Sequence, residues 1–137
     1  MPLDIQTFAV HDISGFPIIL TRPEAIVPGY AEAWEREMDM LLAEGRPFIV
    51  VFPTTGAEEG HEDRKRRGLW LKANKQALAH LCLSLITIEP DGLKRIALKA
   101  QTAMATKAFG IPAQITSSLD EAARLAKQLL SSGKPSE

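Results

Sequence analysis

The sequence predicts a single α/β domain in which four helices pack on a mostly parallel β-sheet. Residues 47–52 form a continuous apolar run rich in β-branched side chains, the pattern of a strand that is buried on both faces. Short apolar runs alternate along the chain with helical stretches of ten or more residues, which favours crossover connections between parallel strands. A chain of 137 residues is long enough for one domain with its own core and too short for two ordinary ones.

The N-terminal region predicts a hairpin followed by an amphipathic helix. Residues 7–13 and 16–21 are two apolar runs separated by a Ser14-Gly15 turn, so we expect a pair of strands that gives the sheet an antiparallel edge. A helix should begin after Pro28-Gly29 and end at Gly45. Its spacing places one apolar face at Tyr30, Ala33, Trp34, Met38, Leu41 and Leu42, and a polar face at Glu32, Glu35, Arg36, Glu37 and Asp39.

The rest of the chain predicts three further strand and helix pairs, beginning with the strand at 47–52. We expect one long helix from about residue 61 to 81, a strand at 83–88, a helix at 93–109, a strand at 113–116 and a last helix. The order is ββαβαβαβα. Ser118 and Glu121 have the spacing of a capping box, in which the serine caps the last helix and Glu121 binds the amide of Ser118. We assign residues 1–130 to the domain and 131–137 to a flexible polar tail.

Composition excludes several classes of protein. The apolar fraction of 45% and the charged fraction of 24% are those of a globular protein, and a net charge of −1 provides no overall attraction for a polyanion. The longest apolar runs are far shorter than the roughly 20 residues that cross a bilayer, and the N-terminal sequence lacks the features of a signal peptide. One cysteine, Cys82, allows no internal disulfide. We therefore expect a cytoplasmic protein of bacterial type.

The element order resembles that of the SpoIIAA-like, or STAS-like, domain family. The resemblance rests on two opening strands, an amphipathic helix, a buried strand that ends in a loop, and a closing strand with the capped helix ITSSLDEAARLAKQLL. It implies a small regulatory or interaction domain without catalytic activity. In the antagonists for which the family is named, a serine in an Asp-Ser-Ser-Gly turn is phosphorylated. The matching turn here is Pro53-Thr54-Thr55-Gly56, so Thr54 and Thr55 are candidate phosphorylation sites, although the nearby Glu58, Glu59, Glu62 and Asp63 oppose a phosphate.

A ligand site, if the domain has one, is predicted at the carboxyl ends of the parallel strands, near a switch in strand order. Those ends carry Thr54, Thr55, His61 and Asp91, together with Glu89, Ser117 and Ser118. These hydroxyls, carboxylates and one imidazole are suited to acid–base chemistry. They are equally suited to capping helices and to local turns, which is the interpretation that we favour.

A second candidate is the basic stretch between Arg64 and Lys75. Arg64, Lys65, Arg66, Arg67 and Lys72 lie near Trp70, and arginine beside an aromatic ring binds phosphates or bases. Asp63 is four residues before Arg67, however, and favours an ion-paired helix face with Trp70 in the core. Metal and cofactor sites are not indicated: the three histidines and Cys82 lack the spacing of metal ligands, and no nucleotide-binding or serine-nucleophile motif is present.

Three functions remain open at this point. We favour a non-catalytic STAS-like module that acts through its surface as a two-fold homodimer, because Trp34 lies on a helix face and the hairpin leaves a free sheet edge. The second is a small enzyme or ligand-binding protein that uses the strand ends, with Thr54, Thr55, His61, Arg64, Arg67 and Asp91 as candidate ligand-binding residues. The third is a polyanion binder that uses the basic stretch.

Overall fold

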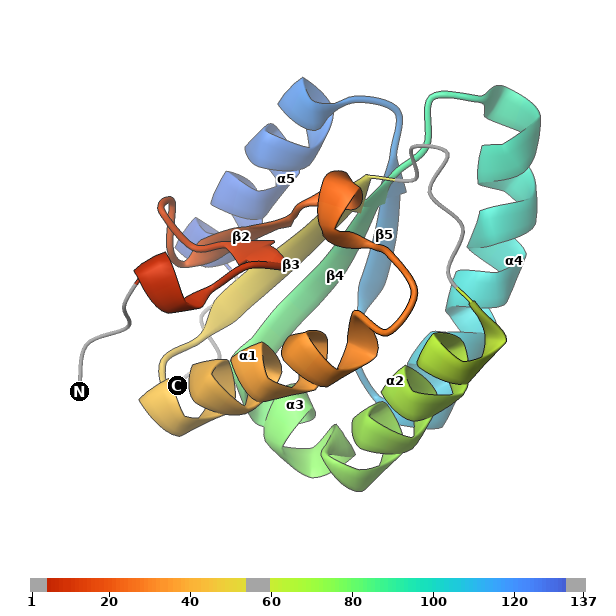
Figure 1. Ribbon diagram of the computed structural model, residues 1–137. Coiled ribbons are helices and arrows are strands. Elements are labelled where there is room, and N and C mark those ends of the chain that lie inside the picture. The colour runs from red at the N-terminus through yellow and green to blue at the C-terminus, as the bar shows by residue number, and fades with distance from the viewer. Residues whose placement is uncertain (1–4, 54–59, 133–137) are drawn as a thin grey trace.

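Five strands form one sheet in the part of the chain that the computed structural model describes, residues 5–53 and 60–132 (Figure 1). The spatial order follows the chain order. The first two strands pair antiparallel and all other pairs are parallel, as the sequence predicts. The strands are β1 (His11–Asp12), β2 (Ile18–Thr21), β3 (Phe48–Pro53), β4 (Cys82–Ile88) and β5 (Ala113–Thr116).

The central strand β3 separates two hydrophobic cores. Phe48, Val50 and Val51 expose 0%, 3% and 1% of their surface, which confirms that this apolar run is buried on both faces. Successive side chains of a strand point to opposite faces. Accordingly, Phe48 and Val50 belong to one core and Ile49 and Val51 to the other.

Helices cover both faces of the sheet unequally. The core of Phe48 and Val50 is covered by helices α1 (Ala31–Glu44), α2 (His61–Ala73) and α3 (Lys75–Leu81), and the opposite core by α5 (Leu119–Ser132). Helix α4 (Gly92–Phe109) has β5 as its main packing partner and lies at that edge of the sheet (Figure 1). The α/β class is as predicted. The number of helices is not, because the described residues contain five α-helices instead of four.

The additional helix arises because the long helix predicted at 61–81 breaks at Asn74. The side-chain Nδ2 of Asn74 donates a hydrogen bond of 2.9 Å to the carbonyl oxygen of Trp70, and Asn74 has the non-helical dihedral angles φ −112° and ψ 18°. Asparagine competes in this way with the backbone bonds of a helix. The break lets Trp70 anchor α2 beside α1, while α3 packs against β4.

The strand predicted at 7–13 is reduced to the two residues of β1. Residues Ile5–Thr7 form a short 3-10 helix instead. The backbone amides of Ala9, Val10 and His11 all donate to the carboxylate of Glu37 in α1, at 2.7–3.1 Å. Amide groups that bind a side chain are not available to a strand ladder, so only the end of the segment pairs with β2.

The start of α5 confirms the predicted cap and corrects its partner. The Oγ of Ser118 accepts a hydrogen bond of 3.1 Å from the amide of Glu121. The carboxylate of Glu121 binds the amide and hydroxyl of Ser117, at 2.7 and 2.8 Å, and not the amide of Ser118. The helix continues to Ser132, so the first two residues of the predicted tail are helical; residues 133–137 lie outside the described part.

Candidate functional site

Among the strands that the structure describes, the order has no switch point at which a ligand site of the predicted kind would form. The parallel strands β2, β3, β4 and β5 follow one another across the sheet without a reversal. Crossovers of the same hand between strands in this order place their helices on one face of the sheet, as α1, α2 and α3 are. The crevice that opens where strand order reverses in doubly wound folds is therefore not part of this architecture.

The predicted site residues that the structure describes at the strand ends lie at the starts of two different helices. Asp91 is the N-cap of α4, where its Oδ1 accepts hydrogen bonds from the amides of Leu93 and Lys94, at 2.9 and 3.1 Å. His61 is the exposed first residue of α2. Thr54 and Thr55, the candidate phosphorylation sites, lie outside the described residues.

Hydrogen bonds favour the ionised form of the Asp91 side chain. The amide bonds from Lys94 and Leu93 lower the pKa of the Asp91 carboxyl, and the charges of Lys94 and Arg95 add to this effect. The carboxylate therefore stabilises the N-terminus of α4.

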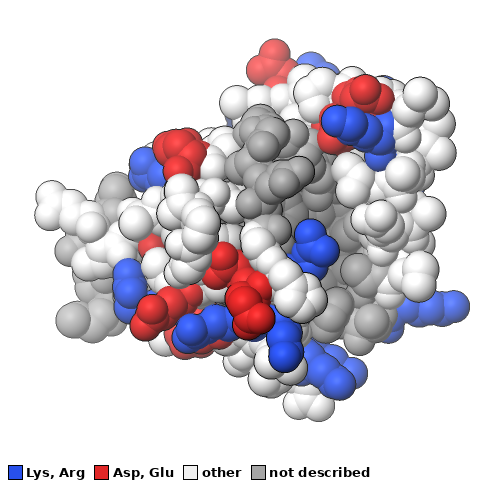
Figure 2. Space-filling model, turned by 45° about the vertical axis from the view of Figure 1, so that its right-hand side comes forward, with Lys and Arg blue, Asp and Glu red and all other residues white. Residues whose placement is uncertain are grey.

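The basic stretch of α2 is largely occupied by contacts within the chain. Arg66 donates to both carboxylate oxygens of Glu35 in α1, at 2.9 and 3.2 Å. The guanidinium of Arg67 lies 5.5 Å from the ring centroid of Trp34. Acidic and basic side chains are interspersed along the side of the molecule formed by α1 and α2 (Figure 2). Arg64 is exposed on the same helix. The pattern favours an ion-paired surface over a continuous basic patch.

Asp63 and Trp70 tie α2 to α1. Asp63, which the spacing suggested as a partner for Arg67, is buried and accepts hydrogen bonds from the amides of Gly29 and Ala31, at 2.9 and 3.1 Å. It thereby satisfies free amides at the start of α1 from another helix. Trp70 is buried, as predicted, and packs edge-on against Trp34 with ring centroids 5.2 Å apart.

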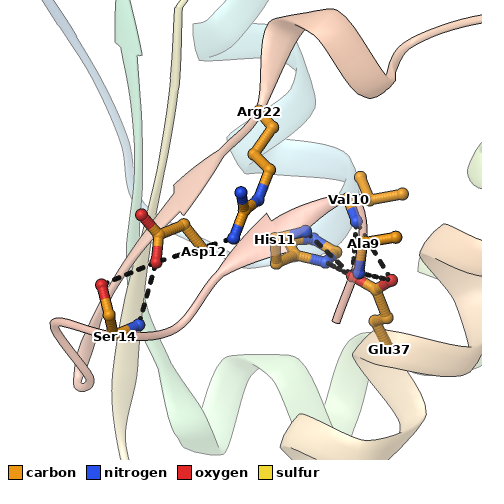
Figure 3. Close-up of polar contacts among 7 residues, drawn as sticks. All are labelled: Ala9, Val10, His11, Asp12, Ser14, Arg22 and Glu37. Carbon is orange, nitrogen blue, oxygen red and sulfur yellow. Dashed lines mark hydrogen bonds and ion pairs between the residues drawn. The ribbon is translucent and has the colours of Figure 1, made fainter. Parts of the chain in front are cut away.

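Sequence reasoning missed a buried polar pair formed by His11 and Glu37. The Nδ1 of His11 lies 2.8 Å from the Oε1 of Glu37, and both side chains have no exposed surface (Figure 3). Burial raises the pKa of Glu37, while hydrogen bonds from His11 and the three backbone amides lower it by more, so the net direction is down. A carboxylate only accepts hydrogen bonds, so Nδ1 is the donor. The helical spacing carries a signal for this residue, because Glu37 is three residues after Trp34 and four before Leu41 and so belongs to the apolar face of α1, not to the polar face where we expected it.

The first cavity lies between the β1–β2 turn, the sheet and the start of α5. Its volume is about 380 Å³. Its lining combines apolar side chains from the sheet and α5 with the polar residues Asp12, Ser14 and Asp120. A second hollow of about 410 Å³ lies between α1 and α2 and is lined mainly by charged residues, including Glu32, Lys65 and Arg66. None of His61, Arg64, Arg67 and Asp91 lines either one.

Helix α4 exposes an apolar face. Leu93, Ile96 and Met104 expose 80%, 68% and 74% of their surface. At 3.6 residues per turn they lie on one side of the helix with Ala97 and Ala100, and the half-buried residues Leu98, Thr102 and Thr106 lie on the side toward β5. We call the set Leu93, Ile96, Ala97, Ala100 and Met104 the α4 stripe. Figure 2 brings this side of the molecule forward, and uncharged side chains dominate the right-hand part of that view.

The described residues offer little sign of a metal site, a reactive cysteine or a membrane-spanning helix. They contain no cluster of three metal-binding side chains. Cys82 is buried, which raises its pKa to about 12, so it packs as a small hydrophobic residue of the core. The helices that the structure describes are all too short or too polar to span a lipid bilayer. Comparison with protein-family models, curated proteins and solved structures gave no match.

Proposed function

We propose that the protein is a non-catalytic, STAS-like interaction module of the bacterial cytoplasm, and that it binds an acidic protein partner through the α4 stripe. The order of strands and helices, with an opening hairpin and a capped closing helix, supports the STAS-like part of the proposal. The observation that carries the binding part is the exposure of three large apolar side chains on one helix that has a single strand as its main support.

The spacing of the α4 stripe suits a protein partner. Exposed apolar residues at positions i, i+3, i+7 and i+11 are the anchors by which an amphipathic helix enters a groove or pairs with another helix. Leu93, Ile96, Ala100 and Met104 have this spacing. The alanines allow a close approach of the partner, and the large side chains supply the apolar area.

The charge of α4 defines the chemistry of that partner. The helix has four basic residues, Lys94, Arg95, Lys99 and Lys107, and no acidic residue, in a chain whose net charge is −1. The three lysines are exposed, and Arg95 donates to the carbonyl oxygens of Glu89 and Pro90. Lysines that border an apolar stripe favour a partner surface with carboxylates around an apolar centre. They oppose a symmetric contact between two copies of α4, which would place like charges together.

A synthetic acidic helix tests this proposal directly. The probe is an amphipathic peptide with leucines at the anchor spacing and glutamates beside them, and its binding is followed by fluorescence anisotropy. We expect the double substitution I96Q and M104Q to weaken binding at least about tenfold, since each anchor contributes roughly 1 kcal/mol or more. Added salt should weaken binding as well, and the same peptide with lysine in place of glutamate should not bind.

A matched control separates binding from stability. Leu69 is also exposed, at 62%, and L69Q removes a similar apolar side chain from another helix, α2. This variant should bind the acidic peptide like the unaltered protein, and all the variants should melt at the same temperature. Binding to phosphatidylglycerol vesicles in place of the peptide would overturn the proposal in favour of a membrane surface. A large loss of thermal stability in the double variant would assign the stripe to folding.

A further inference from the structure

The cavity beside the β1–β2 turn exists because α5 does not cover the whole of its face of the sheet. Helix α5 contacts β3, β4 and β5. The helix does not fully cover the neighbouring strand β2, so the side chains of Ile18 and Leu20 on the α5 face of the sheet are only half-buried. The β1–β2 turn closes the space from the edge of the sheet. We call this space the Asp12 cavity.

The floor of the Asp12 cavity is apolar. Val51 of β3 is buried beneath it, and Ile18 and Leu20 supply the side toward the edge of the sheet. Leu119 and Ala123 of α5 form the facing wall, and Leu119 exposes 54% of its surface. A volume of about 380 Å³ lies within the range of sites that hold small molecules, and an apolar floor with few polar groups is their usual lining.

The rim of the cavity carries two carboxylates. The Oδ1 of Asp12 accepts hydrogen bonds of 2.7 Å from the Ser14 hydroxyl and 3.0 Å from the Ser14 amide (Figure 3). These bonds lower the pKa of Asp12, so its side chain is ionised at neutral pH. Asp120, in the first turn of α5, is exposed on the facing wall.

Arg22 leaves part of the Asp12 carboxylate available. Its Nη2 lies 4.0 Å from the Oδ1 of Asp12, at the limit of an ion pair. All the hydrogen bonds and the ion pair that Asp12 forms with described residues involve Oδ1, and Oδ2 points away from Arg22 and Ser14 in Figure 3. Oδ2 is therefore free to accept a bond from a ligand that enters the cavity.

We propose that the Asp12 cavity binds a small organic cation, in which an aliphatic body lies on Ile18, Leu20 and Leu119 and an ammonium group lies between Asp12 and Asp120. Two carboxylates at the mouth attract a cation and repel a carboxylate or a phosphate. A bare metal ion would gain nothing from contact with the apolar floor, so we expect a ligand that has an apolar part as well as a positive charge. The site is at the β1–β2 edge of the sheet, opposite the edge that holds α4, and is independent of the function proposed for that helix.

Three probes of equal length and different charge test the proposal: hexylamine, hexanol and hexanoate. Each is titrated into the protein while backbone amide resonances are followed by NMR. We expect hexylamine to shift the amides of Gly15, Leu119 and Asp120 along a saturating curve. Hexanol should bind about tenfold more weakly and hexanoate more weakly still, because they lack the charge that the rim selects. Equal shifts with all three probes, or shifts that never saturate, would overturn the proposal.

Two variants test separately how the charge of the rim and the apolar space of the floor contribute to binding. D120N removes one carboxylate from an exposed position and should weaken hexylamine binding about fivefold to tenfold. A123F fills the space beside Leu119 and should abolish binding while the protein still melts cooperatively. The control E24Q removes the same charge from an exposed position outside the cavity and should change nothing. Unchanged hexylamine affinity in D120N would show that the rim does not select the cation. Binding of the acidic peptide to α4 should be the same in all of these variants.

Discussion

The Oε1 of Glu37 in α1 lies 2.8 Å from the Nδ1 of His11 in β1, and neither side chain has any exposed surface. The same carboxylate accepts hydrogen bonds from the amides of Ala9, Val10 and His11. One acidic side chain therefore satisfies four donors and fixes the N-terminal segment against the first helix. A buried carboxylate is tolerated only when it is paired and hydrogen-bonded to this extent.

The first prediction is that E37Q strongly destabilises the fold. An amide has one oxygen where the carboxylate has two, so buried donors of the N-terminal segment lose their acceptor. We expect a loss of about 3 kcal/mol in the free energy of unfolding, measured by urea titration. E35Q on the same helix is the control, because Glu35 is partly exposed and pairs with Arg66 at the surface; it should cost less than about 0.5 kcal/mol. Equal losses in the two variants would show that the buried network contributes little.

The second prediction concerns pH. The pKa of Glu37 is lowered in the folded protein from its ordinary value of 4.5. A group of this kind contributes stability that is present above pH 4.5 and is lost as the pH falls through the folded-state pKa. The pKa values of Asp12, Asp91 and Glu121 are lowered as well and act in the same direction.

Urea midpoints measured from neutral to acidic pH test this expectation. They should fall steadily below about pH 4.5. E37Q should show a shallower fall, because one of the contributing carboxyls is absent. A midpoint that stays constant, or rises on acidification, would contradict the prediction.

The elements that the sequence predicted correctly are those in which local pattern and burial agree. The continuous apolar run of β3 could only be a strand covered on both faces, and Gly45 with a φ of 74° ends α1 as a C-terminal glycine should. The break at Asn74 was missed because the hydrophobic spacing continues through it. It depends on one side-chain bond to Trp70, which periodicity does not record.

The roles of individual polar residues were harder to predict, because they depend on partners far away in the sequence. Helical spacing places Glu37 on the apolar face of α1, but it does not reveal the partner, which is a segment 26–28 residues away in the sequence. Glu35 lies on another side of the helix and pairs with Arg66. Asp63 likewise accepts hydrogen bonds from backbone amides at the start of α1, more than 30 residues earlier in the sequence. The Asp12 cavity could not be predicted because it follows from how far α5 extends across the sheet. The basic and apolar character of α4 was available in the sequence, but its exposure was not.

The third prediction is that V50D prevents stable folding. Val50 is 3% exposed in the central strand and belongs to the core beneath α1. A carboxylate at this position would be buried without a partner, which costs several kcal/mol and should give insoluble protein. Q114D places the same group at an exposed position of β5 and should yield soluble protein of nearly unchanged melting temperature. Soluble, folded V50D would show that the β3 core is far looser than the structure indicates.

The fourth prediction separates a structural from a functional role of Ser118. Its hydroxyl accepts a hydrogen bond from the amide of Glu121, so S118A should lower the free energy of unfolding by about 1 kcal/mol. Binding of hexylamine and of the acidic peptide should be unaffected. S117A removes only an exposed bond to Glu121 and should cost a few tenths of a kcal/mol. Unchanged melting of S118A together with lost binding would place Ser118 in a functional site.

The last prediction concerns the homodimer, which was expected from Trp34 and from the free edge of the hairpin. Trp34 is now accounted for within the chain, where it is buried against Trp70. This leaves the edge strand β1, which is only two residues long, as the remaining surface for two-fold pairing. We still expect a dimer, and sedimentation at micromolar concentration tests for it.

The salt dependence of that dimer identifies the surface it uses. A dimer that pairs β1 edges is held by backbone hydrogen bonds, so its dissociation constant should change little with added salt. A contact between the basic α4 of one copy and the acidic α1 surface of another would weaken steeply with salt. Because such a contact is heterologous, it would also build chains larger than a dimer unless its rotation closes a ring. A monomer throughout the micromolar range would remove the homodimer and leave α4 free for a different partner.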